Sequence, residues 1–450
     1  MCVGWKRRGY FFEGAVHWMT GSSPKAPMNR MYRDTDALND NVKISLSEPF
    51  LSAEWEGETF HFYRDIKKTA EHFLSMSPAD KKQINRFVKD VNTISLFDKP
   101  LTDIKGVKTK NEKRPPLFTF KMLPALFTVL RLYNMTISKY KEQFKHPGIR
   151  WLFSTVPGNH AAINRIYMLS VLDNGDGGYP EGGSPGMIKR MTEAFTAIGG
   201  KLLLNSRVKK INIENGRAAG VSLENKSLEA DAVIVTQETI AAMDQLFEKP
   251  LSEPWLHKMR VKTRPTVSTF ICIGMRAEIR ESPVPYWKLD EPIQYAGRTE
   301  TMLGFYNYAG YKDYAPPGCS VLTSILMGDT YDFWKKAKEE GRYEKEKQNL
   351  ADQISRALCR KYPHVEGKIE VIDIATPLTY ERYTGAYHGS WMTMLYRGEK
   401  FKTYPGYCKT VNGLYFAGHR VIPPGGLPMA VDSGRRAAQM ICREFGAVFK

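Results

Sequence analysis

The chain has 450 residues, which is enough for two or three domains at about 100–200 residues each. Its hydrophobic content of 42% and aromatic content of 12% exclude a disordered segment and a small stapled scaffold. The net charge of +17 favours polyanions such as anionic lipid, nucleic acid or phosphorylated ligands, and charge alone does not choose among them. Because the basic residues are spread along the chain and no nucleic-acid-binding motif is recognisable, we expect no nucleic-acid partner.

Cysteine and histidine spacing gives no sign of a metal site. The six cysteines form no CxxC motif, and the nine histidines form no HxH or HxxxH pair. We therefore expect no bound metal, reduced thiols and a cytoplasmic location. No signal-peptide core follows Lys6, Arg7 and Arg8, and no apolar run reaches the roughly 18 residues that a membrane span needs.

The first part of the chain changes character twice. Residues 1–60 look strand-like and rich in turns, and apolar residues at helical spacing predict a helical stretch over 64–97. A basic linker over 105–114 then precedes an apolar, helix-like run over 117–133. This pair has two interpretations: it lies on an anionic membrane with its apolar side chains as anchors, or it is a solvated loop beside a core helix.

The clearest fold signal lies in the middle of the chain. A glycine-rich loop over 175–186 leads into a helix that is predicted to end at Gly199-Gly200. Asn215-Gly216 predicts a hairpin, and 230–236 is expected to be a strand buried on both faces of a parallel sheet. Helix, antiparallel insertion and buried strand together suggest a dinucleotide-binding crossover. The strands predicted here are 202–204, 208–213, 218–223 and 230–236.

Residues 261–400 look like a separate domain. Strands are predicted near 267–273, 320–327 and 369–374, and a charged helix is predicted over 331–362. The segment 376–390 is unusually dense in aromatic and hydroxyl side chains for a surface loop. The many Phe, Tyr, Met and Trp residues of the chain either line an apolar tunnel or form ordinary core.

A glycine- and proline-rich loop near the C-terminus joins a predicted strand over 414–417 to a predicted helix over 430–445. Glycine lets the backbone approach a ligand closely, and a helix N-terminus offers free N–H groups and partial positive charge to an anion. The pyrimidine edge of a reduced flavin is such an anion. The alternative is a tight connection without any ligand.

The C-terminal motifs YFAGH at 415–419, PPGGLPMA at 423–430 and SGRRAA at 433–438 carry a resemblance to a known family. They resemble the flavin-closing motif of phytoene desaturase-like oxidoreductases, which include carotenoid desaturases and retinol saturase-like enzymes of the flavin amine oxidase superfamily. The resemblance continues, in the family's order, through 5–18, 175–187, 207–236 and 376–385.

The resemblance implies an α/β protein that binds FAD. Its Rossmann-like FAD-binding domain is built from discontinuous segments, with an inserted α+β substrate domain. The expected FAD-binding segments are 1–60, 166–260 and 401–450, and the expected substrate-domain segments are 61–165, which is also the candidate membrane-associating part, and 261–400. The implied reaction is hydride transfer between flavin and an apolar isoprenoid or polyene, in the direction of either desaturation or saturation.

The resemblance also assigns cofactor contacts to particular residues. Gly418 and His419 match the strand end that meets the flavin ribityl and pyrophosphate, although an acidic residue is more usual at His419. Val208 matches the residue whose backbone holds the adenine end. Contacts near the flavin ring are implied for the loop and helix start Gly425, Gly426, Leu427, Pro428 and Met429, and for the N-terminal Gly14, His17 and Trp18.

One departure from the family concerns the phosphate cradle. Family members open with a strand and a G-x-G-x-x-G turn, and this sequence contains no such motif. It begins at Met1-Cys2, roughly where the family's chain leaves that crossover, so we expect the start to lie inside a longer gene product. The alternative is a chain that has lost its main cradle and binds FAD weakly.

Catalytic side chains are not specified by the family pattern, because the flavin does the chemistry. His17, Arg382, Tyr383 and His388 are candidates for donors at the flavin or substrate mouth, and packing roles explain them almost as well. Two other functions stay open. One is a flavin amine oxidase, and the other is a non-catalytic remnant with impaired FAD binding.

Overall fold

The computed structural model describes residues 4–96, 101–109, 117–262, 264–308, 310–393 and 403–449. Residues 110–114 of the basic linker lie outside this part of the chain. No helix in the described residues is long and apolar enough to cross a membrane.

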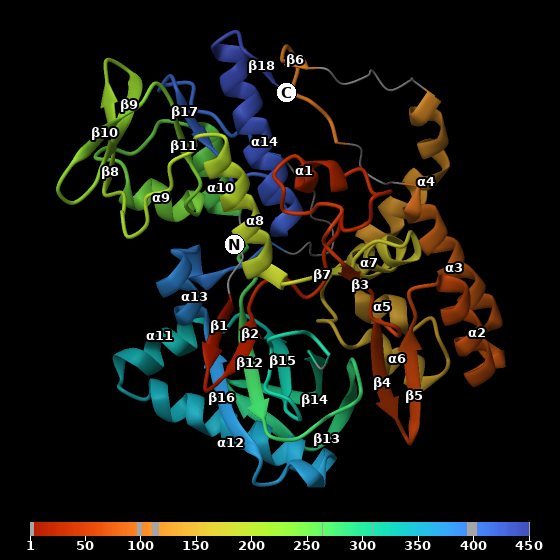
Figure 1. Ribbon diagram of the computed structural model, residues 1–450. Coiled ribbons are helices and arrows are strands. Elements are labelled where there is room, and N and C mark those ends of the chain that lie inside the picture. The colour runs from red at the N-terminus through yellow and green to blue at the C-terminus, as the bar shows by residue number, and fades with distance from the viewer. Residues whose placement is uncertain are drawn as a thin grey trace.

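A seven-stranded sheet organises the lower half of the molecule (Figure 1). All neighbouring strands in it are antiparallel except β13 and β4, which are parallel. β12 is buried along its whole length, so it forms the centre of the core. In spatial order the strands are β16 (Ile369–Ala375), β12 (Ser268–Met275), β15 (Ser320–Met327), β14 (Arg298–Asn307), β13 (Val284–Tyr295), β4 (Leu51–Trp55) and β5 (Glu58–Phe62).

Two helices cover one side of this sheet, α11 (Tyr331–Glu339) and α12 (Tyr343–Lys361). Trp334, Leu350 and Ile354 bury their side chains against the sheet. The prediction of one helix over 331–362 was wrong in one respect, because Gly341 with φ of 71° interrupts it. A positive φ ends a right-handed helix, and glycine adopts it without strain.

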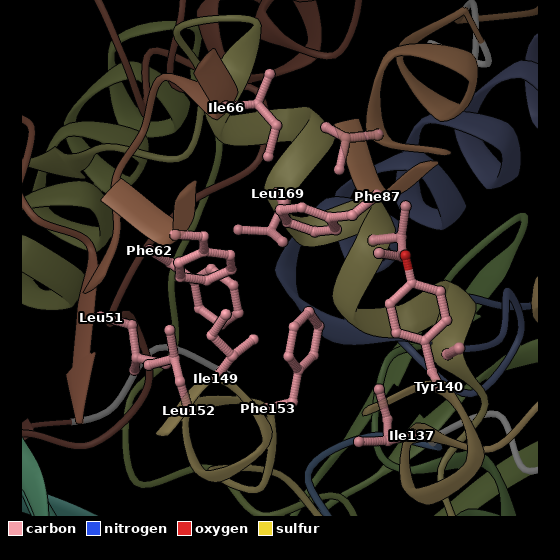
Figure 2. Close-up of a cluster of buried hydrophobic side chains, with 14 of the residues drawn as sticks. Leu51, Phe62, Ile66, Phe87, Ile137, Tyr140, Ile149, Leu152, Phe153 and Leu169 are labelled. Atoms are coloured by element: carbon pink, nitrogen blue, oxygen red, sulfur yellow. The ribbon is translucent and has the colours of Figure 1, made fainter. Parts of the chain in front are cut away.

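Helices pack around β4 and β5 on the other side of the molecule (Figure 1). Phe62, Phe87 and Phe153 meet at the centre of this cluster, with the Phe62 and Phe153 ring centroids 5.1 Å apart (Figure 2). Each buried phenylalanine contributes about 2–3 kcal/mol of hydrophobic stabilisation. The helices are α2 (Ile66–Met76), α3 (Lys81–Ser95), α4 (Leu117–Tyr133), α5 (Ile137–Lys141), α6 (Pro147–Phe153) and α7 (Ala162–Asp173).

The predicted dinucleotide-binding part is recognisable at the upper left of Figure 1. An antiparallel meander of β8 (Lys210–Glu214), β9 (Arg217–Ser222) and β10 (Ser227–Glu229) contains the predicted hairpin turn at Asn215-Gly216. Beside it, β11 (Val233–Val235) pairs in parallel with β17 (Leu414–Phe416). The helix α14 (Gly426–Glu444) follows β17.

Two expectations for this region were wrong. Leu202–Leu204 forms no strand, and all three side chains are exposed, so the apolar run is a loop. Ile234 at the middle of β11 is 38% exposed, so this strand is not buried on both faces. An apolar run shows that a segment can be buried, but it does not say whether another segment covers it.

Short elements connect these parts. β1 (Gly4–Arg7) and β2 (Tyr10–Glu13) form a hairpin near the centre of the molecule. Short two-stranded sheets join β3 (Ile44–Ser45) to β7 (Tyr179–Pro180) and β6 (Lys108–Thr109) to β18 (Val448–Phe449). The remaining helices are α1 (Asn29–Arg33), α8 (Gly183–Ala197), α9 (Thr239–Gln245), α10 (Pro254–Lys262) and α13 (Pro377–Thr384), with one-turn 3₁₀ segments at Pro78–Asp80, Pro363–Val365 and Tyr387–Gly389. The domain boundaries expected from the sequence stay predictions.

Candidate functional site

The C-terminal motif forms a tight connection between β17 and α14. The Gly418 N–H donates to Ser433 Oγ over 2.7 Å, and the Ser433 hydroxyl donates to the Ala430 carbonyl over 2.7 Å. Gly425 has φ of 93°, and a Cβ there would lie 3.0 Å from the His419 carbonyl oxygen. Only glycine tolerates both this φ angle and this contact, so the backbone geometry of the connection requires glycine at position 425.

His419 faces inward from the end of β17. Its Nδ1 donates to the Trp391 carbonyl over 2.8 Å, so Nε2 is left as an acceptor in the neutral ring. Burial, together with the nearby charge of Arg420, lowers the pKa of His419 to about 3. The ring is therefore neutral at physiological pH.

A buried ion pair fixes the next residue. The Arg420 Nε donates to Glu238 Oε1 over 2.8 Å, and its two terminal nitrogens donate to Thr393 Oγ1 and Ser390 Oγ. The other carboxylate oxygen of Glu238 accepts from the Ala241 N–H at the start of α9. This network joins the end of β17, the N-terminus of α9 and the 390–393 segment, three parts of the chain that the sequence does not connect.

An aromatic pocket lies beside the N-terminal segment that the resemblance singled out. His17 Nδ1 lies 2.9 Å from the Tyr308 hydroxyl, and its ring stacks on Tyr306 at 4.8 Å. Burial lowers the pKa of His17 to about 4, so this ring is also neutral. The pocket has a volume of about 30 Å³, which is the space of one water molecule, and Trp18, Arg64 and Tyr311 also line it.

Glu13 holds the following segment, residues 14–18, in place through hydrogen bonds. It is completely buried and accepts hydrogen bonds from the backbone N–H groups of Ala15, Val16 and Ser184, and from the hydroxyls of Ser184 and Tyr179. A buried carboxylate is tolerated only when it is satisfied in this way. Glu13 therefore holds the 14–18 segment against the first turn of α8.

The aromatic pocket and the C-terminal motif meet in one hydrophobic cluster. Leu427 and Met429 of α14 pack against the cluster that contains Val16 and Tyr308. Met429 also packs against the second cluster, around β11 and β17, and Val208 lies on that same cluster. The structure thus brings together the N-terminal and C-terminal segments that were predicted to flank a flavin.

Other candidates lie elsewhere. Arg382 and Tyr383 are exposed on α13, with the guanidinium carbon 5.3 Å from the Tyr383 ring. His388 is stacked between Tyr331, at 4.3 Å, and Tyr387, at 4.1 Å. Arg382, Tyr383 and His388 therefore do not line the aromatic pocket around His17.

Sequence reasoning missed the buried charges Glu13, Arg64, Glu238 and Arg420 and the tyrosines around His17. One signal was available for Glu13, because it is the single charged residue between Tyr10 and Val16 in an otherwise apolar run. The partners of the others are distant in sequence, so no local pattern marks them.

Comparison with known proteins identifies the family. Residues 2–442 match the family of flavin-containing amine oxidoreductases. The chain belongs to this family. It is 25% identical over 423 residues to 1-hydroxycarotenoid 3,4-desaturase of a Flavobacterium species, covering 83% of this chain and 82% of that protein. It is 23% identical to a lycopene-forming phytoene desaturase of a Paracoccus species, covering 98% and 90%.

The comparison of structures agrees with the fold. An oxidoreductase from Methanosarcina mazei superposes with a TM-score of 0.52 at 16% identity, covering 98% of this chain and 90% of that chain. The phytoene desaturase-like resemblance and the flavin amine oxidase-type fold are thereby confirmed. The protein is an FAD-dependent oxidoreductase.

Proposed function

We propose that this oxidoreductase transfers hydride between FAD and a long apolar isoprenoid or polyene at the junction of α14 and the aromatic pocket. The observation that carries the proposal is the packing of Leu427 and Met429 against the cluster that contains Val16 and Tyr308. Relatives that desaturate carotenoid compounds support the substrate class.

The residues at the β17–α14 connection fit the flavin end of the cofactor. Gly425 and Gly426 both have positive φ and no side chain, so a cofactor can approach their backbone closely. α14 is a long helix, and the partial positive charge at its N-terminus favours an anionic group there. The proposed flavin contacts are Gly418, His419, Gly425, Gly426, Leu427, Pro428 and Met429 with Gly14, His17 and Trp18, and Val208 is the proposed adenine contact. Bound flavin supplies the hydride acceptor or donor.

The chain's own residues prepare the environment. The neutral His17 places no charge against an apolar substrate, and it forms one wall of the pocket with Tyr306 and Tyr308. Aromatic rings exclude water and present flat apolar surface to a polyene. The tyrosines must move apart to admit a chain-like substrate, since the pocket holds only about 30 Å³.

The test is a visible spectrum of the FAD-loaded protein during anaerobic incubation with acyclic carotenoids in liposomes. We expect flavin bleaching together with a red shift of the carotenoid absorbance, because desaturation lengthens the conjugated system. Peroxide release from amines with no response to carotenoids would contradict the proposal and favour the amine oxidase reading.

We further propose that α4 docks on a membrane surface from the cytoplasmic side. Ala125 and Leu132 of α4 are buried in the protein, whereas Leu126, Phe127 and Leu130 are exposed, Phe127 to 78%. An exposed apolar face of this kind suits the boundary between headgroups and acyl chains, where an apolar substrate is available.

Liposome flotation tests this docking. Phe127→Glu is expected to lower the bound fraction on anionic vesicles, because a carboxylate opposes both insertion and lipid charge. Phe195→Glu is the matched control, since Phe195 is an exposed phenylalanine on a different helix, α8. Equal flotation of both variants and the parent protein would contradict membrane docking through α4.

A further inference from the structure

Arg165 of α7 is a buried cation. The residue is 5% exposed, and no Asp or Glu in the described part of the chain forms an ion pair with it. Its Nη2 donates to Thr155 Oγ1 over 2.8 Å, its Nη1 lies 3.7 Å from Met168 Sδ, and its Nε–H has no acceptor among these residues. A buried guanidinium without a counter-charge destabilises the fold, so a ligand that supplies one would bind tightly here.

The surroundings of Arg165 are aromatic. Its guanidinium carbon lies 5.5 Å from the ring of Phe62, which Figure 2 places among the buried phenylalanines. Tyr286 and Tyr306 lie near enough for electrostatic interaction with it. Burial lowers the pKa of Arg165 to about 10, so the side chain keeps its charge at neutral pH.

Two tryptophans with unpaired indole N–H groups pack against the same hydrophobic cluster as Phe62. Trp55 belongs to β4, where Ala53 pairs with Tyr286, and alternation along a strand puts Ala53 and Trp55 on one face. Trp151 belongs to α6, and its ring centroid is 5.4 Å from that of Trp55. Neither indole N–H has an acceptor in the described residues. Arg165, Trp55 and Trp151 therefore each carry an N–H donor without an acceptor in the described residues.

Tyr306 links this region to the reaction pocket. Its ring stacks on His17 and lines the pocket, and it also interacts with Arg165. Arg165 does not line this pocket, so Tyr306 must move aside before a ligand in the pocket can reach the guanidinium. A ligand with an apolar body along His17 could then place one end against the guanidinium.

Arg64 provides a contrast, because it lines the same pocket but is already paired. Its guanidinium donates to the carbonyl oxygens of Gly177 and Asp176. Burial lowers the pKa of Arg64, and the nearby carboxylates of Glu48 and Asp176 oppose this shift. Arg64 therefore has a structural role. Within the described ranges, Arg165 has no carbonyl or carboxylate partner of this kind.

We propose that Arg165 binds a carboxylate at one end of the substrate, so that the preferred substrates are polyene or isoprenoid acids. This inference rests on the proposed function, since it extends the same pocket. A guanidinium matches a carboxylate with two parallel N–H···O bonds, which suits an arginine to this role.

Fluorescence titration of the FAD-loaded protein tests the inference, with all-trans-retinoic acid and all-trans-retinol as probes that differ only at the end group. The tryptophans of the protein, with Trp18 in the lining of the pocket, act as reporters by energy transfer to the polyene. We expect the acid to bind at least about tenfold more tightly than the alcohol. Arg165→Gln is expected to abolish this preference by weakening acid binding, whereas Arg150→Gln on the neighbouring helix α6 is expected to keep it.

A second variant guards against misfolding. Arg165→Lys keeps the charge and is expected to retain part of the preference for the acid. Arg165→Gln is expected to raise the melting temperature, because it removes an uncompensated buried charge. Equal binding of acid and alcohol by the parent protein, no binding of either, or an unchanged preference in Arg165→Gln would overturn the inference. Carotenoid desaturation without acid preference would leave the proposed function intact, and acid preference without flavin chemistry would leave the inference intact.

Discussion

Arg420 and Glu238 form an ion pair in which the side chains are 1% and 4% exposed and the Nε and Oε1 atoms are 2.8 Å apart. Arg420 lies at the end of β17 and Glu238 precedes α9, so the pair joins the C-terminal motif to the β11 region. Such a pair adds little net stability as a whole, but the loss of one partner leaves an uncompensated buried charge.

Glu238→Ala is therefore expected to lower the free energy of unfolding by about 3–5 kcal/mol. Glu248→Ala is the control, because Glu248 forms an exposed ion pair with Lys210, and its loss is expected to leave the free energy of unfolding almost unchanged. Urea unfolding measures both. Similar losses in the two variants would show that burial of the Arg420 pair is unimportant.

Gly183 lies where three polar side chains converge. It has φ of 54°, and a Cβ there would collide with the Tyr179 hydroxyl, the Glu13 carboxylate and the Tyr314 hydroxyl. Gly183→Ala is expected to destabilise the protein by about 2–4 kcal/mol, because it adds overpacking to the backbone strain. Gly199→Ala shares the positive φ without any nearby atom, so about 1 kcal/mol is expected. Thermal unfolding of both variants separates the clash from the strain.

His17 predicts a pH dependence. Its pKa is about 4 in the folded state, lowered by burial from the usual 6.5. The unfolded chain therefore binds a proton more readily, and the stability that His17 contributes is present above pH 6.5 and is lost as pH falls toward 4. Between pH 7 and pH 5 the loss is about 2 kcal/mol. Urea unfolding at the two pH values measures the difference in the free energy of unfolding. In His17→Phe this difference is expected to be smaller by that amount, and an unchanged difference would contradict the prediction.

Local features of the fold were predictable because their causes are local. Asn215-Gly216 formed the expected hairpin, and both residues have the positive φ that this turn needs. The strand at 414–416 and the helix after it followed from apolar runs around a glycine loop. The same reasoning failed at Leu202–Leu204 and at Ile234, where exposure depends on what other segments cover them.

The candidate site was predictable only in part, for the same reason. Family motifs pointed to Gly425 and His17, but nothing local indicates that Glu13 accepts hydrogen bonds from Ser184, 171 positions away, or that Arg420 pairs with Glu238, 182 positions away. A buried charge depends on partners that only the tertiary structure brings together. Arg165 belongs to this class as well.

Ser433 gives the last prediction, which connects the loop geometry to cofactor binding. Its buried hydroxyl accepts from the Gly418 N–H and donates to the Ala430 carbonyl, both over 2.7 Å. Ser433→Ala leaves the Gly418 N–H without this acceptor, which costs about 1–3 kcal/mol and loosens the proposed flavin contacts. We expect a lower melting temperature and about tenfold weaker FAD binding in an absorbance titration. The exposed Ser227→Ala serves as control and is expected to change neither quantity. Reduced stability with unchanged FAD affinity would show that the β17–α14 connection lies outside the flavin site.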